Sequence, residues 1–145
     1  MLVTAALLGE HGALYAQFDH LERLAAEATI DDIRAYAGVL AAAVATHARL
    51  EDDLLFAALE PELGPAGPLL QMRREHDEIE AGLECLVHTA DPAAGNALRD
   101  VIRLARAHFA KEEGVLFPMA AGLLAHTTLE RLGAEWAVRR GVLLA

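Results

Sequence analysis

Two stretches of sequence decide the fold: "HARLEDDLLFA" at residues 47–57 and "HFAKEEGVLFP" at residues 108–118. Each begins with a histidine, has a glutamate four residues later and a second acid next to it, and then runs through an aliphatic residue into Leu and Phe. Residues four apart share one face of an α-helix. A buried carboxylate is costly unless it is paired or bound to a metal, so a repeated His-x-x-x-Glu on an apolar helix face needs a chemical explanation.

Turn and capping signals divide the rest of the chain into helical segments. Thr29 followed by Asp32 is typical of a helix start, and the Pro/Gly-rich stretches at 61–68 and 91–95 predict turns. Helices are therefore expected at residues 4–28, 30–60, 69–89, 94–125 and 128–143.

These segments predict an all-α fold. We expect an antiparallel up-down four-helix bundle over residues 1–126. A short C-terminal fifth helix in residues 127–145 is expected to pack on the bundle or to form a dimer face, which makes a homodimer an alternative to a monomer.

The first four segments carry apolar stripes in steps of three and four residues. Each stripe includes one histidine, and the second and fourth also include a glutamate, giving the set His11, His47, Glu51, His76, His108 and Glu112. Beyond the glutamates, the stripes are expected to continue through Leu54 and Ala58, and through Val115 and Met119. With a rise of about 1.5 Å per residue, the six polar residues fall in one layer of the bundle.

Four imidazoles and two carboxylates are too many ligands for one tetrahedral zinc ion. They suit two metal ions bridged by the carboxylates, with the histidines as outer ligands. Mixed nitrogen and oxygen ligation favours iron, with manganese or zinc as substitutes. A weak internal repeat relates "EHGALYAQF" in the first helix to "EHDEIEAGL" in the third, which predicts approximate two-fold symmetry.

The chain resembles the hemerythrin-like family of HHE cation-binding domains. His11 in "GEHGAL", "HARLE" at 47–51, His76 in "REHDEI" and "HFAKE" at 108–112 carry this resemblance over about 120 residues. It implies a non-haem di-iron centre with an oxo or hydroxo bridge, an open position for oxygen or a related ligand, and ligand roles for the six residues of the layer.

The chain departs from the oxygen-carrying members at two points. Glu80 stands where those proteins have a second histidine in the third helix, and acids follow His108 at both four and five residues. More carboxylate and less imidazole favour ferric iron. We therefore expect a protein that binds or senses oxygen or a small oxidant, or alternatively an enzyme acting on peroxide or nitric oxide, or an iron-handling protein. A metal-free helical interaction module is a further alternative.

Other polar residues have weaker signals. Glu80 is either an additional ligand or an edge residue, and Tyr15 is expected to pack or hydrogen-bond near the site. Glu10 and Glu75 are expected at the bundle edge, where contact with a neighbouring imidazole is an option. The remaining side chains are assigned to the surface or, for the cysteine, to the core or its boundary: His20, His88, His126 and Cys85.

The amino-acid composition argues against several classes of binding partner and cellular location. The formal charge of −10 argues against nucleic acid and anionic membranes. The single cysteine rules out an internal disulfide, and the longest charge-free apolar run is too short for a bilayer. A cytoplasmic protein is expected.

Overall fold

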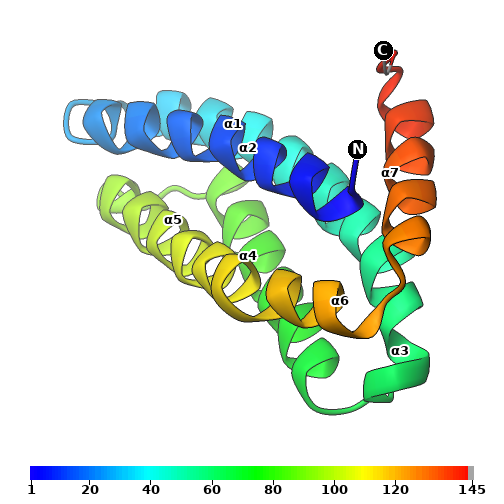
Figure 1. The fold of residues 1–145 in the computed structure, drawn as a ribbon. Coiled ribbons are helices and arrows are strands. Elements are labelled where there is room, and N and C mark those ends of the chain that lie inside the picture. Colours follow the sequence, from blue (N-terminus) through cyan, green and yellow to red (C-terminus); the bar gives the residue numbers. More distant parts are fainter. Residues whose placement is uncertain (144–145) are drawn as a thin grey trace.

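The computed structural model describes residues 1–143 as a helical bundle (Figure 1), which confirms the all-α prediction. The last two residues of the expected 127–145 segment lie outside the described range. The elements are α1 (Val3–Leu24), α2 (Ile30–Leu50), the π-helical turn η1 (Glu51–Phe56), α3 (Ala57–Leu63), α4 (Pro68–Val87), α5 (Ala94–Lys111), the π-helical turn η2 (Glu112–Leu116), α6 (Phe117–Leu123) and α7 (His126–Arg140). In Figure 1, α1 and α2 lie side by side, and α7 stands across the end of the bundle near the N-terminus.

Local chemistry explains where the helices begin and end. The Thr29 hydroxyl accepts from the Asp32 backbone N–H at 3.2 Å, and the Asp32 carboxylate accepts from the Thr29 backbone N–H at 2.9 Å. This reciprocal capping box satisfies two N–H groups at the start of α2. α3 ends at Gly64, whose φ of 75° lies in the left-handed region that favours glycine.

Two of the expected helices contain a π-helical turn. The segments expected at 30–60 and 94–125 change to π geometry at Glu51 and at Glu112, the two glutamates of the sequence motif. Such turns insert extra backbone into a helix and occur often at functional sites. The stripes predicted from regular spacing therefore hold only in part beyond the glutamates: Leu54 is buried as predicted, but Val115 is exposed, and Ala58 and Met119 are only partly buried.

The change of register is visible in the buried residues. Val115 is 57% exposed, whereas Leu116 and Phe117 face the interior. In the other hairpin, Leu59 is buried in place of the expected Ala58. A regular period of 3.6 residues cannot describe a helix that contains a wider turn.

Two apolar clusters fill the interior on either side of the polar layer. Toward one end, Phe18, Leu40 and Leu83 belong to the first cluster. Toward the other end, Leu7 and Leu54 belong to the second cluster. The histidines lie between these positions along each helix, so the polar layer is closed above and below by hydrocarbon.

The C-terminal helix packs on the second cluster. Leu129 and Leu132 are buried there, whereas Leu143 is 98% exposed. At Gly133 the chain passes so close to the Met1 carbonyl that a Cβ would overlap it. Only glycine permits this approach between α7 and the start of the chain.

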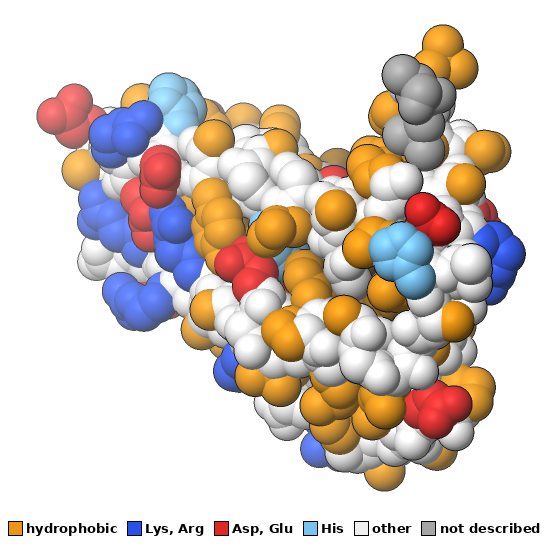
Figure 2. Space-filling model, in the orientation of Figure 1, with side chains coloured by type: hydrophobic (Ala, Val, Ile, Leu, Met, Phe, Trp, Pro, Cys, Tyr) orange, Lys and Arg blue, Asp and Glu red, His pale blue; other side chains and the backbone are white. Residues whose placement is uncertain are grey.

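Basic and acidic side chains lie together at one end of the molecule (Figure 2). In Figure 2, basic side chains gather at the end where α1 meets α2 and where α5 begins. There Arg106 pairs with Asp19 at 2.6 Å and with Glu22 at 2.9 Å, which ties α5 to α1.

Cys85 is exposed rather than at the core or its boundary. Among the described residues, no helix combines the length and the apolar character needed to cross a membrane.

The capping box provides a test of the fold. We expect Thr29→Ala to lower the free energy of unfolding by about 1 kcal/mol, because α2 loses a side-chain acceptor at its first turn. Urea denaturation followed by circular dichroism measures this change. Thr29→Ser keeps the hydroxyl and should retain most of the stability; equal losses in both variants would contradict the capping role.

Candidate metal centre

Six side chains from four helical segments meet in the polar layer. His11, His47, Glu51, His76, His108 and Glu112 are all at most 4% exposed. They form two groups whose potential ligand atoms lie within 4.8 Å of one another. The first group contains His11 and His47, the second contains His76 and His108, and both include Glu51 and Glu112. We call these the first and second half-sites.

Each glutamate presents one oxygen to each half-site. Glu51 Oε1 lies 3.4 Å from His47 Nε2, and its Oε2 lies 3.3 Å from His76 Nε2. Glu112 Oε2 lies 3.3 Å from His11 Nε2, and its Oε1 lies 3.0 Å from His108 Nε2. Each half-site therefore offers two imidazole nitrogens and two carboxylate oxygens, and the glutamates span both.

Outer carboxylates fix the orientation of three imidazoles. His11 Nδ1 lies 2.9 Å from Glu113, His47 Nδ1 lies 2.7 Å from Glu10, and His108 Nδ1 lies 2.9 Å from Glu75. A carboxylate at Nδ1 requires a proton there, so the lone pair of each Nε2 points into the site. For His76 the nearest outer carboxylate is that of Asp52, at 3.8 Å, beyond hydrogen-bond distance.

From the sequence no contact is predicted for Glu113, the second acid after His108, but the structure places it against His11. In a π-helical turn, hydrogen bonds reach five residues along the chain, so neighbouring acids both reach the site. Glu112 faces the centre while Glu113 contacts His11. The paired acids after each histidine motif are the sequence signal for this arrangement. Glu10 and Glu75 make the contacts with neighbouring imidazoles that the sequence left as an option.

Aromatic rings cover the imidazoles. Phe109 stacks on His11 with ring centroids 4.0 Å apart and planes 7° from parallel. Phe117 stacks on His11 and Phe56 on His76, each with centroids 5.6 Å apart. These rings separate the polar layer from the solvent and reduce the local dielectric, which strengthens electrostatic interactions inside it.

The polar atoms at the centre need a positive charge. Both oxygens of Glu51, both oxygens of Glu112, and His108 Nε2 are buried without a hydrogen-bond partner among the described residues. His11 Nε2 and His47 Nε2 lie 3.0 Å apart. Since both rings donate their Nδ1 protons outward, this contact needs a further proton on one of the two Nε2 atoms, and that proton satisfies only part of the cluster. Cations between the nitrogens and the oxygens would satisfy all of these atoms.

The negative charge of the carboxylates also shifts the pKa values of the histidines in the site. Burial by itself lowers the pKa of His11, but the carboxylates of Glu112 and Glu51 outweigh it and raise this pKa to about 10. Burial likewise acts against protonation of His76, while the carboxylates of Asp52, Glu112 and Glu51 raise its pKa to about 11. Burial raises the pKa of Glu51, yet the neighbouring imidazoles keep it well below its usual range. The centre is thus an anionic pocket that attracts positive charge.

The other candidates from the sequence lie apart from the two half-sites. Glu80 is exposed and belongs to neither group, so the structure places it away from the centre. Tyr15 donates its hydroxyl to Glu113 at 3.1 Å and so contacts the site indirectly. His20, His88 and His126 are exposed, as expected.

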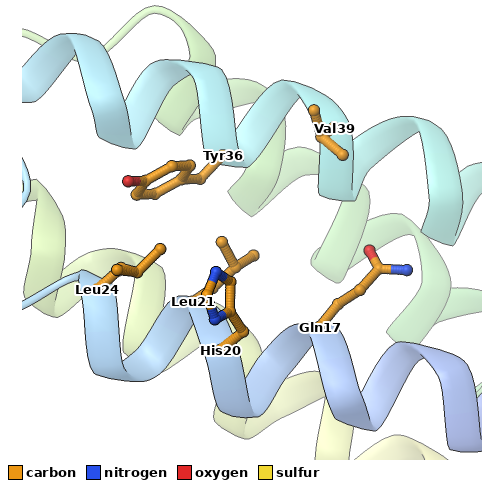
Figure 3. A pocket seen from close by; sticks show the side chains of 6 residues that line it. All are labelled: Gln17, His20, Leu21, Leu24, Tyr36 and Val39. Atoms are coloured by element: carbon orange, nitrogen blue, oxygen red, sulfur yellow. The ribbon is translucent and has the colours of Figure 1, made fainter.

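Several surface pockets are lined in part by α1, and one of them includes Glu10, His47 and Arg140. Another, between α1 and α2, is lined by Gln17, His20, Leu21, Leu24, Tyr36 and Val39 (Figure 3), and none of the six candidate ligands reaches it. A third is lined by apolar residues of α1 and α6 together with Glu113 and Phe117. Because Glu113 and Phe117 both contact His11, this third pocket lies directly outside the first half-site.

Comparison with known proteins agrees with this geometry. Residues 2–120 match the family model of the hemerythrin HHE cation-binding domain. The chain belongs to the hemerythrin HHE family. The match covers all six residues of the two half-sites and confirms the resemblance drawn from the sequence, and the buried His/Glu groups of this HHE domain fit a metal site. Searches of curated proteins and of solved structures gave no match.

Metal removal tests whether the centre of this HHE domain is a metal site. We expect the midpoint of thermal unfolding to fall when a chelator is added to iron-loaded protein, because the charges of Glu51 and Glu112 lose their partners. At a hundredfold excess of metal over Kd, binding stabilises the folded state by roughly 3 kcal/mol, or roughly 5 to 10 °C for a chain of this size. Calorimetry with and without chelator measures the shift. An unchanged midpoint would favour a metal-free interaction module whose polar layer only fixes the helix register.

Proposed function

We propose that this protein binds two iron ions within an antiparallel up-down four-helix bundle, and that it binds or senses oxygen or a related small oxidant. His11 and His47 hold one ion, His76 and His108 hold the other, and Glu51 and Glu112 bridge them. The ions supply a redox centre and a coordination position for the small ligand.

The observation that carries this proposal is the orientation of the two glutamates. Each directs one oxygen to the first half-site and the other to the second. A single metal ion would use one side of each carboxylate and leave the other side buried and unpaired. Nitrogen and oxygen ligands in equal number favour iron over the softer thiolate-bound metals, with manganese and zinc as substitutes.

The side chains around the first half-site favour the proposal that the ligand is a small molecule. The pocket beside Glu113 and Phe117 is lined mainly by Leu8, Phe117 and other apolar side chains, a surface that suits an uncharged diatomic molecule better than a polar metabolite. Glu113, which also lines this pocket, accepts hydrogen bonds from Tyr15 and His11. Tyr15 and Glu113 thereby hold a proton close to His11 at the edge of the site.

An enzyme acting on peroxide or nitric oxide, or an iron-handling protein, is the second candidate. The observation favouring it is the number of carboxylates near the ions: Glu51 and Glu112 at the centre, with Glu10, Glu75 and Glu113 against the imidazoles. Anionic ligands and outer anions stabilise ferric iron, which disfavours the cycle of reversible oxygen release.

One experiment distinguishes these functions. Reduced, iron-loaded protein is exposed to oxygen and then returned to anaerobic conditions while its absorption spectrum is followed. For binding or sensing we expect a new spectrum that reverses on removing oxygen, with two irons per chain by metal analysis. Prompt irreversible oxidation would favour peroxide, nitric-oxide or iron chemistry. Protein that retains no iron after reconstitution would overturn the metal proposal.

The bridging role of the glutamates can be tested separately. We expect Glu51→Gln to weaken retention of both iron ions, because a neutral amide replaces an anion that faces both half-sites. Metal analysis after competition with a chelator measures retention. Glu80→Gln is the matched control, since it makes the same change at an exposed position four residues after His76 and should retain two irons. Loss of iron in the control would restore Glu80 as a ligand.

A further inference from the structure

The two half-sites differ in how their outer carboxylates are held. Glu10 precedes His11 and contacts His47, just as Glu75 precedes His76 and contacts His108. The internal repeat makes Glu10 and Glu75 equivalent, 65 residues apart in the chain. Their other hydrogen-bond partners, however, come from different parts of the protein.

Glu75 is held by the bundle itself. Gln71, one turn earlier on α4, donates to its Oε1 at 2.6 Å, and the Lys111 ammonium of α5 pairs with the same oxygen. The equivalent positions in the other half of the repeat are Ala6 and Leu50. Neither side chain can donate a hydrogen bond, so the bundle has no corresponding donors for Glu10.

The C-terminal helix supplies the missing donors. Trp136 Nε1 donates to Glu10 Oε1 at 2.7 Å. Arg140 forms a fork on the same carboxylate, with Nε 2.7 Å from Oε1 and the terminal nitrogen 2.9 Å from Oε2. A bidentate arginine–carboxylate pair fixes direction as well as distance. Glu10 Oε2 also accepts from His47 Nδ1, so the orientation of His47 depends on α7.

α7 is docked by contacts independent of this fork. Leu129 and Leu132 are buried in the second apolar cluster, and Gly133 permits close approach to Met1. In Figure 1, α7 stands beside the N-terminal part of α1. Glu10 belongs to the first half of this helix, which spans Val3–Leu24. The family match ends at residue 120, so these donors come from outside the matched domain.

We propose that α7 contributes to the metal centre. Its residues Trp136 and Arg140 are positioning residues, which hold Glu10 and thereby orient the imidazole of His47. The first half-site then depends on α7 for the donors that hold Glu10, whereas Glu75, the equivalent carboxylate of the second, is held by donors within the matched domain. This inference rests on the proposed binding of two metal ions. Outer partners of a metal-bound histidine fix its tautomer and ring direction, and their loss typically reduces metal affinity 10- to 100-fold.

The test compares substitutions that remove one donor at a time. Trp136→Phe removes the indole N–H and keeps an aromatic ring, and Arg140→Gln removes the fork. Arg139→Gln is the matched control, because Arg139 pairs with Asp53 and Glu135 on the surface and does not contact Glu10. Lys111→Met makes the reciprocal change at Glu75. Apo protein is titrated anaerobically with Co²⁺ against a competing chelator, and binding is followed by visible absorption and by metal content.

For Trp136→Phe and Arg140→Gln we expect one equivalent of Co²⁺ to bind as in the unmodified protein and the other to bind 10- to 100-fold more weakly. Lys111→Met should likewise weaken one equivalent, and Arg139→Gln should weaken none. Circular dichroism checks the fold. If Arg140→Gln loses helix, the milder Trp136→Phe still decides the question.

Unchanged binding of both equivalents in Trp136→Phe and Arg140→Gln would overturn the role of α7 while leaving the two-metal proposal intact. Equal weakening of both equivalents would overturn the assignment to one half-site. Unmodified protein that fails to bind two ions would instead refute the proposed function, and this inference with it.

Discussion

The structure depends on two carboxylates buried in a hydrocarbon interior. Glu51 and Glu112 are fully buried and have no hydrogen-bond partner among the described residues. An isolated ionised carboxylate in such surroundings is very unfavourable. The inward-facing Nε2 atoms of the four histidines, the outer carboxylates that orient three of these rings and the aromatic rings beside them are all consistent with positive charge placed between the two glutamates.

The backbone adapts to this constraint through the π-helical turns. In a regular helix, residues four and five positions after a histidine point in directions about 100° apart. The turns at Glu51 and Glu112 allow neighbouring acids to serve one site, so that Glu112 faces the centre and Glu113 holds His11. Leu116 and Phe117 then replace Val115 in the interior. Irregular backbone at these points is thus part of the site.

Approximate two-fold symmetry relates the half-sites, but their surroundings differ. Phe56 on His76 matches Phe117 on His11. In contrast, Tyr15 corresponds to the exposed Glu80, and Phe109 corresponds to Ala48. The pocket beside Glu113 lies at the first half-site, and Phe109 stacks on His11 there. The repeat therefore supplies similar ligands to both positions, while the residues outside the repeat pattern give the two positions different access and different outer contacts.

The sequence by itself determined the helical fold, the family and the candidate ligands. Hydrophobic periodicity and capping chemistry act over one or two turns, so "HARLE" and "HFAKE" identify an inward face without knowledge of the partner helices. Tertiary structure decided what a regular helix period cannot express. The helices widen into π-helical turns at Glu51 and Glu112, and Val115 lies on the surface. Glu80 lies outside the site, and Arg140 contacts Glu10 although the two are 130 residues apart in the chain. Contacts between residues so distant in sequence depend on how whole helices pack, and the spacing of residues within one helix does not predict that packing.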